Sequence, residues 1–303
     1  MFESHFQTFT DDANGAMGPE RLAALRRELA RRGLDGFLIP RADEHQNEYT
    51  PPCAERLAWL TGFTGSAGAA VVLPHAAALF VDGRYTLQAP AQVDGQAFAI
   101  FNSGETAPDA WLEKQVKKGW RIACDPWLHT PAQLARHERA VKAAGGVLVH
   151  ADSNPLDAIW TDRPAPPLGA VTLHPARFSG EDAQTKIARI QAALGKADAL
   201  VLSDPHAVAW AFNLRGADVA HTPIALCFAI VPAKGKPVLY VDPRKLGDAV
   251  RAGLSFLKLA APEALLADIG ALGASKKLVR FDAATVPVRL VQALGAAGGT
   301  ADV

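Results

Sequence analysis

The sequence predicts an α/β protein with two domains, each a mixed sheet flanked by helices. Short apolar runs of strand length alternate with segments of helical periodicity along the chain. In each half, two neighbouring apolar runs joined by a short link indicate a hairpin, which makes the sheet mixed rather than purely parallel. The length of 303 residues also agrees with two domains, because domains usually hold about 100–200 residues.

The order of elements is similar in the two halves. The first half is expected to contain helices over 19–32, 85–92, 109–117 and 131–141 and strands over 36–39, 69–73, 77–81, 98–101, 121–124 and 147–149. The second half is expected to contain helices over 181–194, 244–252, 263–272 and 286–294 and strands over 199–202, 225–231, 238–241, 254–259 and 278–281. The shared order suggests a duplicated domain.

Two tryptophans support the repeat, and a proline-rich stretch separates its copies. Trp59 and Trp210 each end a short helix just before a hairpin, and we expect both to be buried packing residues without a ligand role. The stretch 151–175 is rich in proline, as in a semi-rigid spacer, so we expect domains over 1–158 and 159–303. The glycine-rich segment 295–300 has the composition of a linker.

The composition excludes several classes of protein. Equal numbers of basic and acidic residues, 31 of each, give no electrostatic footprint for nucleic acid or an anionic membrane. No apolar run approaches the ~20 residues that cross a bilayer, and residues 1–17 lack the basic start and apolar core of a signal peptide. The three cysteines are few and far apart, which argues against a disulfide framework or a zinc knot. We expect a cytoplasmic protein.

The glycine-rich stretch before the first hairpin resembles two catalytic motifs but fits neither. Ser66 lies in Thr64-Gly65-Ser66-Ala67-Gly68, close to the G-x-S-x-G nucleophile elbow. That elbow requires a strand before the serine and a helix after it, and here the order is reversed. The glycines do not follow the G-x-G-x-x-G spacing of a dinucleotide site either. Ser66 is therefore expected to bond backbone in a tight turn.

A polar loop collects Asp43, Glu44, His45 and Glu48, which are metal-type ligands. One loop is a poor platform for a catalytic metal, which draws its ligands from several fixed elements. We expect this loop to form hydrogen bonds across an interface or at the rim of a cleft. Arg84 follows the turn Asp82-Gly83 at a strand end, where ligand sites gather in α/β proteins; on residues alone, an ion pair with Asp82 is the more natural expectation.

Several motifs together resemble the cytosolic-type Xaa-Pro aminopeptidases (aminopeptidase P). The matching stretches are Asp43-x-His45-Gln46-x-Glu48-Tyr49, Pro52-Cys53, Gly62-Phe63-x-Gly65-Ser66-Ala67-Gly68, Asp82-Gly83-Arg84-Tyr85-x-Leu87-Gln88-Ala89, and Ala209-Trp210-x-Phe212-Asn213-Leu214-Arg215-Gly216-x-Asp218-Val219 with Pro223. The resemblance covers essentially the whole chain and is specific only in combination. It implies two tandem creatinase N-terminal-like domains.

The resemblance also implies what this chain lacks. Members of the family carry a third, pita-bread domain that holds two divalent metal ions, usually manganese, and all the catalytic residues. No motif of that domain occurs here, so we expect it after residue 303 and expect this segment to be inactive, with no catalytic, metal or cofactor residues of its own. The complete enzyme would remove the N-terminal residue from peptides with proline in second position and would form a homodimer, and Arg84 would contact the peptide.

Two other functions remain open. The chain could be a stand-alone, non-catalytic creatinase-like module for binding or dimerisation, which a natural stop codon after residue 303 would indicate. A catalytic domain encoded directly downstream would instead indicate the aminopeptidase. A serine hydrolase built on Ser66 is a distant third, and reactivity toward a fluorophosphonate probe would identify it.

Overall fold

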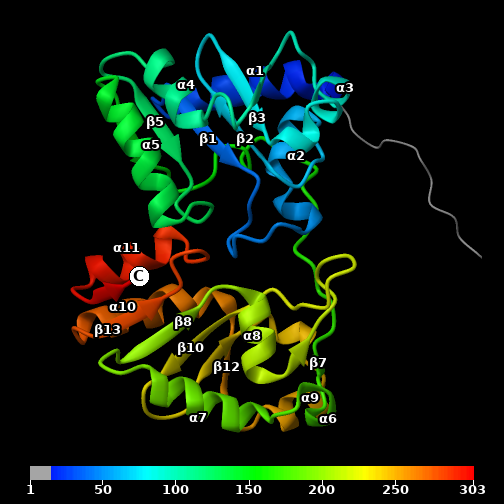
Figure 1. Cartoon of the computed structure of the whole chain (residues 1–303), viewed down its shortest axis with the longest axis vertical. Coiled ribbons are helices and arrows are strands. Elements are labelled where there is room, and N and C mark those ends of the chain that lie inside the picture. Colours follow the sequence, from blue (N-terminus) through cyan, green and yellow to red (C-terminus); the bar gives the residue numbers. More distant parts are fainter. Residues whose placement is uncertain (1–14) are drawn as a thin grey trace, which may run out of the picture.

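The computed structural model describes residues 15–303, which form two α/β domains stacked along the long axis of the molecule (Figure 1). The first domain contains α1 (Gly18–Arg31), α2 (Arg56–Thr61), α3 (Gln88–Gln92), α4 (Pro108–Gln115), α5 (Pro131–Ala143), β1 (Gly36–Pro40), β2 (Gly68–Val72), β3 (Ala77–Val81), β4 (Ala99–Asn102), β5 (Arg121–Cys124), β6 (Val147–His150) and the 3-10 turns η1 (Gly15–Met17), η2 (Pro52–Ala54) and η3 (Gly83–Tyr85). The second domain contains α6 (Ala176–Ser179), α7 (Ala183–Ala193), α8 (Pro205–Phe212), α9 (Asp248–Gly253), α10 (Leu265–Ala274), α11 (Val288–Ala296), β7 (Thr172–Leu173), β8 (Ala199–Leu202), β9 (Leu214–Arg215), β10 (Phe228–Pro232), β11 (Val238–Tyr240), β12 (Lys258–Ala260), β13 (Leu278–Phe281), β14 (Thr300–Asp302) and the turns η4 (Pro243–Lys245) and η5 (Pro262–Ala264).

Both main sheets are mixed and share one topology. The first has the order β4-β3-β2-β1-β5-β6, and the second has the order β12-β11-β10-β8-β13-β14. In each main sheet the strand that comes second in chain order, β2 or β10, runs antiparallel to both of its neighbours, and all other pairs are parallel. The predictions of mixed sheets and of a duplicated domain are therefore confirmed.

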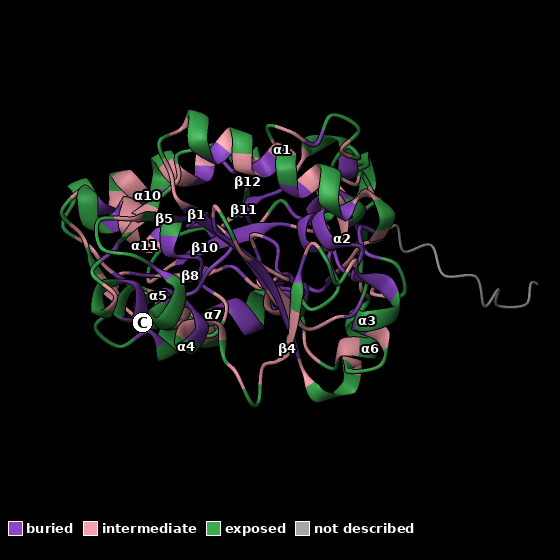
Figure 2. Cartoon of the chain, turned by 90° about the horizontal axis from the view of Figure 1, so that it is seen from above, coloured by how far each residue is buried: buried purple, intermediate pink, exposed green. Residues whose placement is uncertain are grey.

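Helices cover both faces of each sheet, and the central strands between them are largely buried (Figure 2). In the first domain one hydrophobic cluster lies beneath α1 and α2 and another beneath α4 and α5. In the second domain the corresponding clusters lie beneath α7 and α8 and beneath α10 and α11. No helix within residues 15–303 is long and apolar enough to cross a membrane.

The N-terminus of α5 is fixed by its own sequence. The Thr130 side chain accepts a hydrogen bond from the backbone N–H of Gln133, whose side chain bonds back to the Thr130 N–H, and Pro131 occupies the first turn. This capping box satisfies two backbone donors that a helix start leaves unpaired. The helix expected over 131–141 is therefore present as α5, and its start forms one side of the cleft described below.

The two domains meet along a seam of backbone and side-chain contacts. The N–H of Val288, at the start of α11, donates to the carbonyl of His129 at 2.9 Å, and the N–H of Arg289 donates to the carbonyl of Pro126 at 2.9 Å. Trp127 of the first domain packs against the second domain's cluster beneath α10 and α11. The two domains therefore hold each other through directed bonds as well as apolar packing.

The chain between the domains is anchored at both ends, and at its far end the Gly169 N–H donates to Asp218 at 2.9 Å. Trp160 stacks on Trp59 with ring centroids 5.3 Å apart, and Arg163 donates to the carbonyl of Cys53 at 2.7 Å. From 163 to 170 the chain has no regular structure and most of its residues are exposed or half-buried. The domain boundary placed between 158 and 159 stays a prediction.

The C-terminal segment differs from its expected linker character. Residues 295–296 complete α11, and Thr300–Asp302 form β14, which pairs in parallel with β13 at the edge of the second sheet. Gly298 makes the reversal with φ of +95°, a backbone conformation that favours glycine. The glycines that suggested a linker are therefore those of a tight helix-to-strand turn.

The expectation for the two tryptophans is wrong for Trp210. Its side chain is 51 % exposed, lies over the Lys186 ammonium at 4.7 Å, and is not part of the core. Trp59, at the same place in the repeat, is half-buried against the first domain's core because Trp160 covers it. The local sequence is similar, but only the first site receives a cover from the chain that follows the domain.

Because the two tryptophans differ in burial, we expect their replacement by alanine to lower the free energy of unfolding by different amounts. Trp59→Ala should lower the free energy of unfolding by about 2–3 kcal/mol, somewhat less than a fully buried tryptophan would cost. Trp210→Ala should lower it by less than about 1 kcal/mol, because the ring is largely in water. Urea unfolding followed by circular dichroism measures both values, and equal losses in the two variants would contradict the assignment.

Candidate functional site

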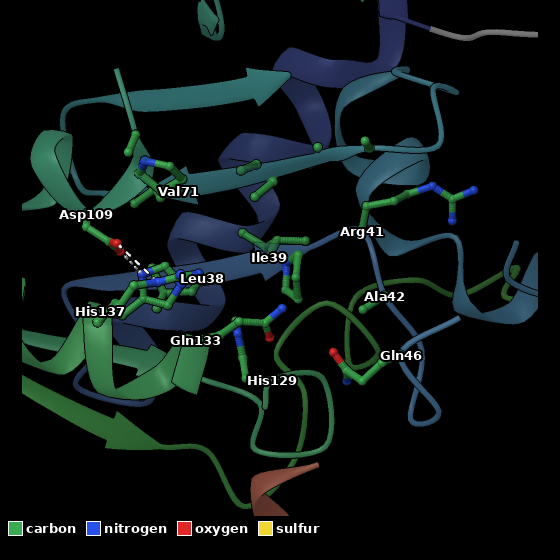
Figure 3. A pocket seen from close by; sticks show the side chains of 18 of the residues that line it. Leu38, Ile39, Arg41, Ala42, Gln46, Val71, Asp109, His129, Gln133 and His137 are labelled. Carbon is green, nitrogen blue, oxygen red and sulfur yellow. Dashed lines mark ion pairs between the residues drawn. The ribbon is translucent and has the colours of Figure 1, made fainter. Parts of the chain in front are cut away.

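The main candidate site is a cleft of ≈ 870 Å³ that lies mostly on the first domain, where β1 ends and β2 begins, and that Ala284 of the second domain also lines. Small residues of β2 and the turn before it, from Ala67 to Ala70, line one side, and the starts of α4 and α5 line another. Figure 3 shows Asp109 and His137 together at one end of the cleft and Arg41 at the other. This strand-end position is where ligands commonly bind in α/β folds.

Arg84, in the turn after β3, is among the residues that line this cleft. Its guanidinium forms an ion pair with Asp82, with Nη2 2.5 Å from Oδ2, and lies 5.2 Å from the centre of the Tyr85 ring. The pairing expected from the residues alone is thus present, and hydrogen bonding to Arg84 lowers the pKa of Asp82. The Arg84 side chain is still 64 % exposed, so its outer donors face solvent beside the cleft.

The second domain repeats this pair. Arg244 follows β11 as Arg84 follows β3, and its Nη2 lies 2.6 Å from Oδ2 of Asp242. In both turns the aspartate also accepts a hydrogen bond from the arginine's own backbone N–H at 2.9 Å. The Asp-x-Arg pair is therefore a feature of the repeat, and what distinguishes Arg84 is the cleft beside it.

Ser66 is part of a hydrogen-bonded group on the cleft wall. Its Oγ donates to Oε1 of Glu48 at 2.8 Å and lies 2.9 Å from the Tyr85 hydroxyl, which also accepts from the Ser66 N–H at 3.2 Å. The partners of this serine are a carboxylate and a phenol rather than the imidazole that would activate a nucleophile. The turn needs glycine at position 65, because a Cβ there would approach the Phe63 ring to 2.3 Å.

The acidic loop after β1 is a structural element that reaches across the domain seam. Asp43 is fully buried and accepts hydrogen bonds from the backbone N–H groups of His45 and Asn47, both at 3.0 Å. His45 donates through Nδ1 to the carbonyl of Ser203 in the second domain at 2.8 Å. The expectation of hydrogen bonds across an interface is confirmed. Within residues 15–303, no three or more His, Cys, Asp or Glu side chains are grouped so as to hold a metal ion.

The other end of the cleft holds groups that the sequence did not single out. His137 Nδ1 forms a close ion-pair contact with Asp109 Oδ1, without the alignment of a hydrogen bond, and Arg136 lies 3.7 Å from the same carboxylate. Burial would raise the pKa of Asp109, but these neighbours outweigh it and the pKa is lowered. His129 packs edge-on to His137, and its Nε2 is buried without a partner.

His129 is held in its neutral form. Desolvation, with smaller contributions from His137 and His150, lowers its pKa to about 3. Sequence spacing gave no signal for this cluster, because Asp109 starts one helix while His129 and His137 flank the start of another. Only the packing of α4 against α5 brings them together.

Two family profiles, both described as Creatinase/Prolidase N-terminal domain, match the chain, one over residues 21–157 and the other over residues 162–302. A protein named probable Xaa-Pro aminopeptidase P from Aspergillus niger is 37% identical over 264 residues, which are 85% of this chain and 43% of that protein. A protein of the same name from Neosartorya fischeri is 35% identical over 284 residues, or 91% of this chain and 43% of that protein.

A solved structure agrees with these relatives. The X-prolyl aminopeptidase from Caenorhabditis elegans, described as a cytosolic enzyme with a di-nuclear active site, superposes with a TM-score of 0.86 at 27% sequence identity. The match covers 94% of this chain and 49% of that one. The chain thus spans less than half the length of these relatives.

The neutral His129 predicts acid sensitivity. The folded protein keeps this imidazole unprotonated down to about pH 3, whereas an unfolded chain takes up the proton near pH 6.5. Stability present above pH 6.5 is therefore lost as the pH falls below it. Below pH 6.5 we expect this residue to lower the free energy of unfolding by up to about 1.4 kcal/mol for each unit that the pH falls. Urea titrations should give a shallower pH dependence for His129→Gln, and equal slopes would contradict the buried neutral state.

Proposed function

We propose, from the premise that the chain belongs to the creatinase/prolidase N-terminal domain family as two tandem domains, that it is the substrate-access part of an Xaa-Pro aminopeptidase. The observation that carries the proposal is the continuous similarity to aminopeptidases of this type through both domains and the connector, 91% of this chain for the Neosartorya fischeri protein. The complete enzyme would remove the N-terminal residue from peptides with proline in second position, and we expect it in the cytoplasm as a homodimer.

The chemistry is assigned to a part of the enzyme outside these domains. The C. elegans enzyme is described as having a di-nuclear active site, and the family resemblance implies two divalent ions, with manganese the usual metal. The described residues offer no group of three or more metal ligands, so they do not fit such a centre. Their own contribution would be to bind and orient the peptide.

The cleft beside Arg84 suits that task. A guanidinium stays charged at any working pH and presents several donors in a fixed plane to a carbonyl or carboxylate. Ser66, Glu48 and Asn47 add neutral and acidic hydrogen-bonding groups along the same wall. A peptide, which carries a donor and an acceptor at nearly every residue, could use both kinds of group.

The first prediction from this proposal is that the segment has no activity by itself. Purified residues 1–303 should neither bind two manganese ions per chain nor hydrolyse a peptide with proline in second position. Metal analysis and a peptide-cleavage assay, with the C. elegans enzyme as the positive control, measure both properties. Specific turnover by the purified segment would show that the chemistry lies within these two domains.

The second prediction concerns Arg84 in the complete enzyme. Arg84→Ala should lower kcat/KM by ~10-fold or more, as the loss of a charge-assisted hydrogen bond of about 1.5–3 kcal/mol requires. Arg84→Lys should recover part of the loss, because an ammonium cannot reproduce the planar fork. Arg244→Ala is the matched control, since it removes the same aspartate pair from the second domain. Unchanged kinetics in Arg84→Ala, with stability intact, would assign Arg84 a purely structural role.

A further inference from the structure

His45 occupies a slot in the second domain. Its imidazole stacks on Phe228 with ring centroids 4.2 Å apart, while Nδ1 lies 2.8 Å from the carbonyl of Ser203. That carbonyl can only accept, so Nδ1 carries the proton. The His45 side chain belongs to the first domain and is 6% exposed, with both its ring face and its donor used by the second.

The repeat identifies this slot as the counterpart of the cleft. In the first sheet, Pro40 at the end of β1 lies opposite Ala69 of β2. In the second sheet Leu202 of β8 lies opposite Ala229 of β10, as Ile39 lies opposite Ala70 in the first. One position further along, Ser203 therefore corresponds to Pro40, and Phe228 corresponds to Ala69. The second domain's copy of the cleft is therefore filled by a loop of the first domain. The first domain's copy, floored by a small alanine, is open.

The loop that fills one slot also forms a wall of the other. Gln46, Asn47 and Glu48 follow His45 directly and line the open cleft. The buried Asp43 ties the two parts of the loop together, since one of its oxygens accepts from the N–H groups of both His45 and Asn47. The seating of His45 therefore constrains the position of the three residues that face the cleft.

From this wall, direct contacts lead to Arg84. Glu48 accepts a hydrogen bond from the Ser66 hydroxyl at 2.8 Å, and the Ser66 hydroxyl lies 2.9 Å from that of Tyr85. The Arg84 guanidinium in turn lies 5.2 Å from the centre of the Tyr85 ring. Each step is a hydrogen bond or a ring contact between neighbouring side chains. The cleft wall from Asn47 to Arg84 is thus continuous with the slot in the second domain.

We propose that His45 is a positioning residue for the first domain's cleft: by seating in the second domain it fixes the loop 42–49 and, through it, the polar wall beside Arg84. The ligand role of that wall rests on the proposed function, whereas the positioning rests on the contacts alone. The second domain then contributes to the site through its slot, which holds the first domain's loop in place.

Amide hydrogen exchange by NMR on the 303-residue chain tests the positioning directly. In His45→Ala, the Asn47 amide should exchange about 10-fold faster, the effect expected when an interdomain hydrogen bond and a ring contact no longer oppose local opening. His45→Asn, which can keep a donor toward Ser203, and His45→Phe, which keeps the ring on Phe228, should each recover part of the protection. His75→Ala, at an exposed turn of the first domain, is the control and should leave Asn47 unchanged.

The same variants separate positioning from a general loss of stability. We expect the Ser66 and Arg84 resonances to shift in the order Ala greater than Asn or Phe, while the melting temperature of His45→Phe stays within about 2 °C of the wild type. Unchanged Asn47 exchange and Ser66 resonances in all three His45 variants would overturn the proposal. Acceleration spread equally over both domains would also overturn it, because that would be global destabilisation.

Calorimetry with the tripeptide Ala-Pro-Ala then distinguishes this inference from the proposed function. If the wild type binds the peptide, His45→Ala should raise the Kd about 10-fold, with His45→Asn and His45→Phe between them. Binding that is unaffected by His45→Ala would overturn the inference while leaving the cleft as a peptide site. If the wild type shows no binding, the proposed peptide role of the cleft in this chain fails, and the exchange data alone decide whether His45 positions the wall.

Discussion

The polar wall of the cleft depends on the antiparallel register of β1 and β2. Where the pairing ends, the N–H of Arg41 donates to the carbonyl of Gly68 at 2.9 Å. This bond brings the loop after β1 beside the turn before β2, so that Ser66 reaches Glu48. A slip of one residue would turn every side chain of β2 to the opposite face and would separate these two loops. The site is thus a consequence of strand pairing before it is one of side-chain chemistry.

Local sequence patterns were sufficient to predict most helices and strands, but not which side chains other segments would cover. Alternation of apolar runs, the Thr130-Pro131 helix start and the two hairpins are local signals, and the structure contains the elements they predicted. Trp210 was misjudged because its burial depends on what covers the helix, which its own sequence does not encode. The segment 295–300 was misjudged because glycine serves linkers and tight turns alike, and only pairing with β13 makes it a strand.

In the candidate site, too, contacts between residues close in sequence were predicted and contacts that depend on packing were not. The sequence around Asp43 and His45 indicated a polar loop at an interface. The partner of His45, however, is a backbone carbonyl 158 residues away, which no pattern of side chains can reveal. The pair of Arg84 with Asp82 spans two residues and was foreseen. His129 was not, because its neutral state comes from burial between elements. Chemistry that arises from local spacing is visible in sequence, and chemistry that arises from packing is not.

The charges in the cleft favour a peptide over a strongly charged ligand. Each guanidinium on its lining already has a carboxylate partner: Arg84 with Asp82, Arg41 with Glu55 and Arg136 with Asp109, at 2.5, 2.9 and 3.7 Å. A phosphate or a polyanion would have to compete with these pairs for its counter-charge, at the cost of leaving carboxylates unpaired. A peptide backbone needs only hydrogen bonds and can take the donors that each fork leaves free. The pairing of each arginine with a carboxylate also agrees with the balanced charge of the chain, 31 residues of each sign. Under the proposed function, such a cleft would orient a peptide through hydrogen bonds rather than through net charge.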